Sequence, residues 1–321
     1  MNKKPIIIVA GEPYSTFLEI FFKIKKKNKF KKPIIIIVSK SLLLSQMKRL
    51  GYKYNIKILD QRLMNFNKIK NKHINIINVD FKSTNPFGKI STKSNAYIDN
   101  CFDIAVELFK KKQCSGLING AISKKHFLKD KFFGITEYLA HKTKTKKFSM
   151  LIYNKNLSVS PITTHLPLKD VNKNISKIKI INHVNLITKF YIKQFNKKPR
   201  IAITGLNPHC ESNYKSSEED RLIIPTIKYL IKKKFKVEGP FPADTIFMKN
   251  KLKQFDVIIG MYHDQVLTPL KAIFGFNAIN ITLGLPFIRI SPDHGPNSPM
   301  LGKNLSNPKS LLESLKFLDK K

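Results

Sequence analysis

Three of the eight histidines occupy the same kind of position in the sequence. His165 follows the run LSVSPIT, His209 follows IAITG after a short turn, and His263 follows FDVIIG. Each run is typical of a buried strand, so each imidazole is predicted at or just past the carboxyl end of a strand. Three imidazoles converging from separate strand ends would form a divalent-metal site with open positions for substrate, suited to Zn²⁺ or another borderline cation. The alternative is that each histidine hydrogen-bonds locally in its own loop.

The densest run of polar side chains is MYHDQVLTPLKAIFGFNAINITLGLPFIRISPDHG, which starts at Met261. It contains two pairs of histidine and aspartate, the second being Asp293 and His294, and it also contains Lys271, Asn280 and Arg289. Arg289 is one of only five arginines, and a guanidinium is suited to bidentate contact with an anion. A structural ion pair is its alternative role. Lys271 could bind an anion or satisfy the last carbonyls of a helix.

The common nucleotide-binding fingerprints are absent from this sequence. It has no Gly-x-Gly and no Gly-Lys-Ser/Thr at the spacing of a P-loop. HExxH and GxSxG are absent as well. A dinucleotide that binds here would therefore not use the glycine-rich Rossmann turn.

Short β-branched runs alternate with longer amphipathic segments along the chain. The predicted strands are Ile6–Val9, Ile34–Val38, Ile74–Val79, Gly116–Asn119, Leu157–Thr163, Ile201–Thr204, Val257–Ile259 and Ala278–Thr282. The predicted helices are Thr16–Lys27, Ser41–Leu50, Tyr97–Lys112, Val184–Phe195, Glu218–Lys233 and Asp264–Phe274, with Gly51 ending the second. This alternation predicts an α/β fold with largely parallel sheets, in which ligands bind at the carboxyl ends of the strands.

The chain is strongly basic. It has 321 residues, and 59 Lys+Arg against 21 Asp+Glu give a formal net charge of +38. Such a charge attracts phosphates, so a polyanion-binding protein is one alternative function. The excess is nearly all lysine and is spread along the chain, which predicts a solvated surface without a specific nucleic-acid or membrane partner.

Cysteine content and hydropathy indicate where the protein works. Three cysteines without a CxxC spacing argue against a disulfide framework or a zinc ribbon and favour a reducing cytoplasm. The apolar run Pro5–Ala10 is too short for a signal peptide and is predicted as a strand. No apolar stretch approaches the roughly 18 residues of a membrane span, so we expect a soluble, cytoplasmic protein.

Several longer segments resemble a known family. THLPLKDV, GLNPHC, GPFPADTIF, MYHDQVLTPLK and NITLGLPFIRISPDHG are similar, in order, to signature blocks of the 4-hydroxythreonine-4-phosphate dehydrogenases of pyridoxal phosphate biosynthesis, the PdxA family. The resemblance implies an isocitrate/isopropylmalate dehydrogenase-like fold, with two α/β lobes flanking an active-site cleft. It also implies a homodimer with the active site near the subunit interface. We place the first lobe at residues 1–130 plus 290–321 and the second at 131–289.

The resemblance implies roles for individual residues. His165, His209 and His263 match the family's metal ligands, and Thr136, Lys271, Asn280 and Arg289 match its substrate-binding positions. Asp244 in PADT matches a motif that lines the same cleft, where a proton acceptor is expected. Its alternative role is a helix N-cap.

The implied reaction uses NAD or NADP and one divalent metal (Zn, Mg or Co) per active site. It oxidises 4-phosphooxy-L-threonine to 2-amino-3-oxo-4-phosphooxybutanoate, which decarboxylates to 3-amino-2-oxopropyl phosphate. One departure from the family pattern is that GITE stands where the family has GHTE, so that Ile135 replaces a histidine that contacts substrate. Isoleucine cannot hydrogen-bond, which raises two alternatives: a dehydrogenase of another phosphorylated hydroxy acid, such as erythronate or threonate 4-phosphate, and a catalytically silent homologue.

Overall fold

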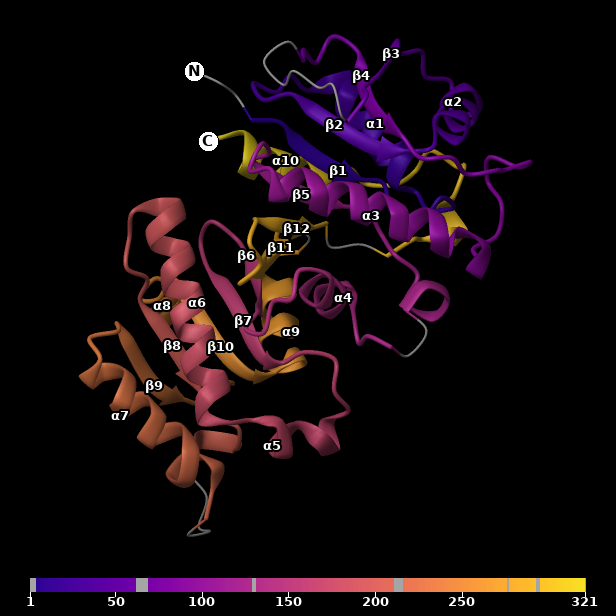
Figure 1. Ribbon diagram of the computed structural model, residues 1–321. Helices are drawn as coiled ribbons and strands as arrows, with labels where there is room; N and C mark the ends of the chain where they lie inside the picture. Colours follow the sequence, from indigo (N-terminus) through magenta and orange to yellow (C-terminus); the bar gives the residue numbers. More distant parts are fainter. Residues whose placement is uncertain are drawn as a thin grey trace. The chain divides into compact units, whose positions relative to one another are not determined.

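The structure is a computed structural model that describes residues 4–61, 69–128, 131–210, 216–275, 277–292 and 295–320. The chain divides into two compact units, here called unit 1 (residues 1–144 and 285–321) and unit 2 (residues 145–284). Strands alternate with helices in both units (Figure 1), which confirms the predicted α/β class.

The boundaries between the units differ from those expected from sequence, which were 130/131 and 289/290. Two elements account for the difference. Helix α4 (Ile135–Lys142) belongs to unit 1, because its Tyr138 ring packs edge-on against Phe102 and Phe127. Strand β12 (Arg289–Ser291) also belongs to unit 1, because it pairs with β5 (Gly116–Asn119). Thr136 and Arg289 therefore lie in the same unit.

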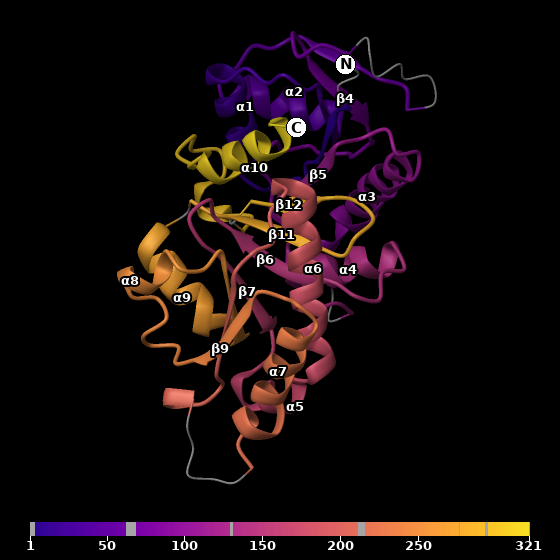
Figure 2. The same cartoon turned by 90° about the vertical axis from the view of Figure 1, so that its left-hand side faces the viewer.

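Unit 1 is built on a parallel sheet. In spatial order its strands are β3 (Ile56–Ile58), β4 (Ile74–Asn78), β2 (Ile34–Val38), β1 (Ile6–Val9), β5 and β12. The central strands consist almost entirely of buried isoleucine and valine, as expected where helices cover both faces of a parallel sheet. Figure 2 shows α1 (Phe17–Lys27), α2 (Lys40–Arg49) and α10 (Lys309–Asp319) on one side of this sheet and α3 (Asn95–Lys110) on the other.

Gly51 ends α2 as predicted. Its φ is +74°, a conformation that glycine adopts without steric cost. The amide of Gly51 donates to the carbonyl of Lys48 (3.2 Å), and the amide of Tyr52 donates to that of Met47 (3.0 Å). This pair of hydrogen bonds is a Schellman motif, which satisfies two carbonyls at the end of the helix.

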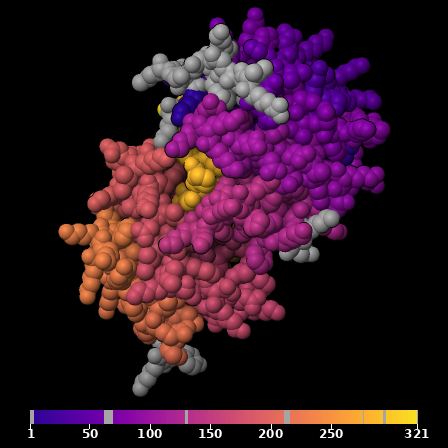
Figure 3. Space-filling view, viewed as in Figure 1, coloured from indigo at the N-terminus to yellow at the C-terminus, as the bar shows by residue number. Residues whose placement is uncertain are grey.

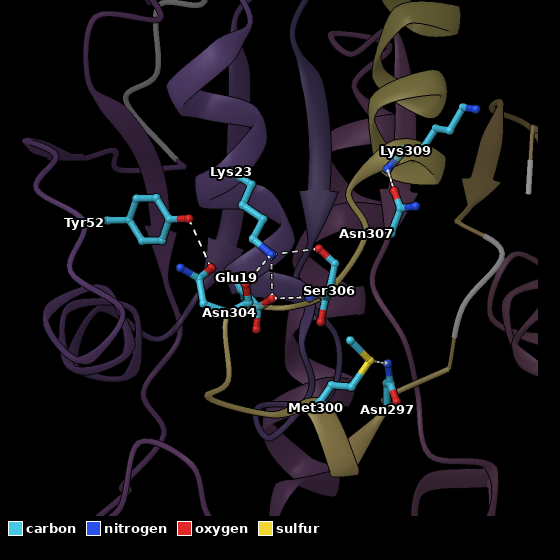
Figure 4. Close-up of polar contacts among 9 residues, drawn as sticks. All are labelled: Glu19, Lys23, Tyr52, Asn297, Met300, Asn304, Ser306, Asn307 and Lys309. Carbon is cyan, nitrogen blue, oxygen red and sulfur yellow. Dashed lines mark hydrogen bonds and ion pairs between the residues drawn. The ribbon is translucent and has the colours of Figure 1, made fainter.

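The C-terminal segment is attached to α1 by an ion pair between the half-buried Lys23 and the buried Glu19 (Figure 4). Lys23 Nζ lies 3.0 Å from Glu19 Oε1 and donates to the carbonyl oxygens of Asn304 and Ser306, both at 2.8 Å. The amide of Ser306 donates to the same Glu19 oxygen at 2.6 Å. These contacts link residues far apart in sequence, and they explain why residues 285–321 form one unit with residues 1–144.

Unit 2 is built on a mixed sheet. In spatial order its strands are β11 (Ile279–Leu283), β6 (Ser149–Tyr153), β7 (Ser158–Thr163), β10 (Val257–Tyr262), β8 (Ile201–Thr204) and β9 (Val237–Phe241). β6 runs antiparallel to both of its neighbours, whereas β7, β10, β8 and β9 are parallel. The long helix α6 (Lys177–Phe195) and helix α9 (His263–Phe274) lie on opposite sides of this sheet (Figure 2).

The described lysines lie at the surface of both units, with Lys32 the only buried one among them. Figure 3 shows one face of the molecule, from which many side chains project outward. In the described part of the chain, no helix combines the length and apolar character needed to cross a membrane.

Candidate functional site

The three histidines follow three neighbouring strands of unit 2. β7 ends two residues before His165, β10 ends where His263 begins α9, and β8 ends five residues before His209. β10 pairs in parallel with both β7 and β8. Because neighbouring parallel strands end at the same edge of a sheet, all three histidines lie at one edge.

The histidines are not all in mutual contact. The rings of His165 and His263 have centroids 6.0 Å apart. His209 is exposed in the short turn Pro208–Cys210, with a left-handed φ of 58°. Within the described ranges, no three His, Cys, Asp or Glu side chains form a group that could hold a metal ion. The structure thus brings two of the predicted ligands together, and the three-histidine metal site stays a prediction.

The donor set is nevertheless of the right chemical kind for a divalent ion. His263 Nδ1 lies 2.6 Å from Asp264 Oδ1. The other ring nitrogen, Nε2, is on the side of the imidazole away from this carboxylate. Metal-binding histidines commonly use one ring nitrogen for the metal and the other for a carboxylate, which fixes the orientation of the ring. The imidazoles therefore fit a metal in donor type and in strand position.

Arg289 and Thr136 come together inside unit 1. Arg289 is fully buried; its Nε donates to Asn119 Oδ1 (2.6 Å) and its Nη1 to Thr136 Oγ1 (3.3 Å). Burial lowers the pKa of Arg289 to about 9, and the nearby Glu137 opposes that shift. Both of these partners are neutral side chains, so the structural ion pair and the anion-binding role both stay predictions. Asn119 was not identified from the sequence, although a polar residue that ends a buried strand is a usable signal.

The other predicted residues are more dispersed. Asn280 lies on β11, where its Nδ2 donates to Met150 Sδ (3.5 Å) and its buried Oδ1 has no hydrogen-bond partner among the described residues. A hydroxyl or ammonium group of a substrate could donate to that oxygen. Lys271 is exposed in the last turn of α9.

Asp244 is exposed in a turn that follows β9. Helix α8 (Lys249–Leu252) begins five residues later with Met248 at its N-cap, so Asp244 does not have the alternative role of helix cap. The pair Asp293 and His294 lies outside the described residues.

Glu12 is a buried acid that the sequence did not reveal. It lies in the loop between β1 and α1, is 2% exposed, and accepts a hydrogen bond from Ser94 Oγ (3.1 Å). Burial raises its pKa to about 7, although hydrogen bonds from Ser94 and from the Tyr14 amide act in the opposite direction. A carboxyl group that titrates near neutrality is a candidate functional group.

Comparisons with known proteins agree along the full chain. Residues 29–318 match the family described as "Pyridoxal phosphate biosynthetic protein PdxA". A 4-hydroxythreonine-4-phosphate dehydrogenase from Sulfurihydrogenibium sp. is 38% identical over 97% of this chain and 96% of its own length. One from Aquifex aeolicus is 34% identical over 99% and 98%.

Two further comparisons concern structure and substrate. The crystal structure of 4-hydroxythreonine-4-phosphate dehydrogenase from Klebsiella pneumoniae superposes with a TM-score of 0.84 at 27% identity, covering 98% of both chains. A relative from Oceanobacillus iheyensis, 30% identical over 98% of this chain and 97% of its own, is provisionally named a D-threonate 4-phosphate dehydrogenase.

Proposed function

The chain belongs to the PdxA family of pyridoxal phosphate biosynthesis, and we propose that it is a cytoplasmic 4-hydroxythreonine-4-phosphate dehydrogenase that uses NAD or NADP. The observation that carries this proposal is its full-length similarity to relatives of that name. The proposed substrate is 4-phosphooxy-L-threonine, whose secondary alcohol is oxidised to the ketone of 2-amino-3-oxo-4-phosphooxybutanoate. That ketone is β to the carboxylate, so the product loses CO₂ and becomes 3-amino-2-oxopropyl phosphate.

His165, His209 and His263 would hold one divalent ion (Zn, Mg or Co), which when bound polarises the substrate hydroxyl, while a bound nicotinamide accepts the hydride. The remaining polar residues orient the substrate. The ammonium of Lys271 is exposed and suits a phosphate or carboxylate. The buried Oδ1 of Asn280 suits a substrate donor.

Residues of unit 1 provide the other groups proposed for substrate binding. Arg289 and Thr136 are hydrogen-bonded to each other, so their side chains would bind the substrate together. In unit 2, Asp244 is exposed in the turn that follows β9 and is the proposed proton acceptor.

A second candidate substrate follows from Ile135, the first residue of α4. This half-buried side chain offers no hydrogen bond where the resembling family has a histidine. D-threonate 4-phosphate carries a hydroxyl in place of the ammonium of phosphooxythreonine, and one relative is provisionally named for it. A site with one fewer polar contact would discriminate less strongly between these two substrates.

A substrate panel tests the proposed reaction. Phosphooxythreonine, threonate 4-phosphate and erythronate 4-phosphate are each offered with NAD and with NADP at one fixed metal concentration, and NADH or NADPH absorbance is followed. We expect the highest kcat/KM with phosphooxythreonine. A higher value with threonate or erythronate phosphate would reverse the ranking, and no reduction of either nucleotide with any of them would indicate a silent homologue.

We also propose that the protein is a homodimer. Large apolar side chains such as Leu168 (71% exposed) and Ile178 (69% exposed) lie on the surface of unit 2, where a partner subunit could cover them. Light scattering coupled to size-exclusion chromatography measures the mass directly. A monomeric mass at micromolar concentration would contradict the proposal.

A further inference from the structure

Gln265 connects the ends of two strands that precede predicted metal ligands. Its Oε1 accepts from Thr204 Oγ1 (2.8 Å) and from the Met261 amide (2.7 Å), and its Nε2 donates to the Gly205 carbonyl (2.8 Å). Thr204 ends β8, which leads to His209, and Met261 lies near the end of β10, which leads to His263. One buried amide therefore joins the two chain segments at the sheet edge where both histidines emerge.

The environment of Gln265 permits little movement. The residue is 8% exposed. A Cβ added at Gly260 would come within 3.1 Å of Gln265 Oε1, so the backbone of β10 passes close to the amide. Because its carbonyl accepts two hydrogen bonds and its NH₂ donates one, the amide has a single orientation that satisfies all three partners.

Glu219 binds the residues that directly follow Gly205 and lead into the His209 turn. Its Oε1 accepts from the amides of Leu206 (2.7 Å) and Asn207 (2.9 Å), and its Oε2 accepts from Asn207 Nδ2 (2.8 Å). Glu219 is 1% exposed at the start of the π-helical turn Glu219–Ile223. Burial acts to raise its pKa, but the hydrogen bonds from Asn207 and Leu206 outweigh burial, so its pKa is lowered and the carboxylate stays ionised.

The two side chains act on consecutive backbone groups. Gln265 binds the carbonyl of Gly205, and Glu219 binds the next two amides. A Cβ added at Gly205 would lie 2.7 Å from Cys210 Sγ and 3.0 Å from Glu219 Oε1, so the turn folds back tightly onto this glycine. His209 is the residue directly before Cys210, in the left-handed conformation.

We propose that Gln265 and Glu219 are positioning residues that fix the His209 turn against the strand end bearing His263, and so set the affinity of the site for a divalent ion. The inference rests on the proposed metal site. Hydrogen-bonded groups behind metal ligands typically change metal affinity by about 10- to 100-fold when removed, because the ligands must then be ordered as the metal binds.

The test is a titration of the metal-free full-length protein with Co²⁺, whose visible absorption reports the geometry of its ligands. Gln265→Glu has nearly the same shape, but its carboxylate cannot donate to the Gly205 carbonyl. Glu219→Gln loses the negative charge and one acceptor for Asn207. The matched control is Glu218→Gln, which removes the same charge one residue away. Glu218 Oε2 accepts from the Asn207 side chain (3.0 Å), whereas Glu219 also accepts from two backbone amides.

We expect Gln265→Glu and Glu219→Gln to bind Co²⁺ about 10- to 100-fold more weakly, with an altered absorption spectrum, and Glu218→Gln to bind like the wild type. Far-UV circular dichroism and unfolding midpoints establish that each variant is folded. If Gln265→Glu does not fold, Thr204→Val removes one of the three bonds with little change in volume, and its weaker binding and changed spectrum are the expected result. Wild-type affinity and spectrum in the folded variants would overturn the inference.

The same titration separates this inference from the proposed function. If wild-type protein binds no stoichiometric Co²⁺, or if His209→Ala binds it as tightly as the wild type, the metal assignment itself fails and the inference fails with it. Stoichiometric binding that is lost in His209→Ala but unchanged in both positioning variants would leave the metal site in place and overturn only the roles of Gln265 and Glu219.

Discussion

Single charged residues have different consequences in this chain according to their burial. Lys271 is exposed, so water screens its charge and substitution affects mainly what it binds. Glu12 is 2% exposed, so its ionisation is costly and substitution affects the stability of the fold. At the scale of the residue, substitution is therefore expected to change ligand binding at Lys271 and fold stability at Glu12.

Lys271→Gln tests anion binding at the predicted site. If its ammonium contacts the substrate phosphate or carboxylate, loss of a hydrogen bond to a charged group costs about 1.5–3 kcal/mol and lowers kcat/KM roughly 10- to 100-fold. Steady-state kinetics with phosphooxythreonine measure the effect. Lys228→Gln is the control, because Lys228 is an exposed lysine of helix α7 (Ile224–Lys232) and its loss removes the same charge from the general positive field. An equal loss of kcat/KM in both variants would show that Lys271 acts only through the overall positive charge of the protein.

Glu12→Gln tests the effect of burial on pH stability. Glu12 has a pKa of about 7 in the fold against an ordinary 4.5, so between these values the folded protein holds a proton that the unfolded chain releases. Its contribution to stability is complete below pH 4.5 and is lost as the pH rises to about 7, a change of about 3 kcal/mol. Glutamine does not titrate, so the variant should gain stability relative to the wild type across this range.

Urea unfolding at a series of pH values measures that difference. The control is Glu107→Gln, since Glu107 is an exposed residue of α3 and its substitution removes the same charge. Curves for Glu12→Gln and wild type that run parallel from pH 4.5 to 7 would contradict the raised pKa of Glu12.

At the scale of elements, the packing of the strand ends in unit 1 decides where polar groups can lie. Gly120 follows β5, and its amide donates to the Val9 carbonyl at the end of β1 (2.8 Å). A Cβ at Gly120 would overlap the carbonyl oxygen of Ala10 and come 2.8 Å from the Phe17 ring. This close approach brings the loop of Glu12 beside the strand that ends in Asn119, the partner of Arg289.

Gly120→Ala should therefore be strongly destabilising. Overpacking against backbone costs typically about 1–3 kcal/mol and more where the backbone cannot move. The unfolding free energy from urea titration measures the loss. Gly295→Ala is the matched control, because a Cβ there meets no described atom within 4 Å. A Gly120→Ala variant as stable as Gly295→Ala would show that β1 and β5 separate easily at this end.

At the scale of the whole molecule, the net charge of +38 predicts weak and unspecific binding of polyanions. We expect affinity for a short DNA duplex to fall at least about a thousandfold between roughly 50 and 200 mM salt, since the contacts are to phosphates. Fluorescence anisotropy with two duplexes of different sequence measures both the salt slope and the preference. Sequence-selective binding that survives moderate salt would instead support the polyanion-binding alternative.

The sequence by itself determined most of the core strands and their alternation with helices along the chain. Runs such as Ile6–Val9 and Ile34–Val38 are strands with the predicted bounds, and Gly51 ends its helix, because these features depend on local hydrophobicity and backbone conformation. Four strands, β3, β6, β9 and β12, were missed, because a strand of a few residues takes its stability from its neighbours in the sheet.

Only the tertiary structure decided which polar groups meet. Arg289 contacts Asn119 across 170 residues, and Gln265 contacts Thr204 across 61, pairings that depend on the order of strands in each sheet. The raised pKa of Glu12 likewise comes from burial beneath segments distant in sequence. Local patterns encode elements, whereas the partners and the solvation of a side chain depend on how those elements pack, so the supports of the candidate site become visible only in the folded chain.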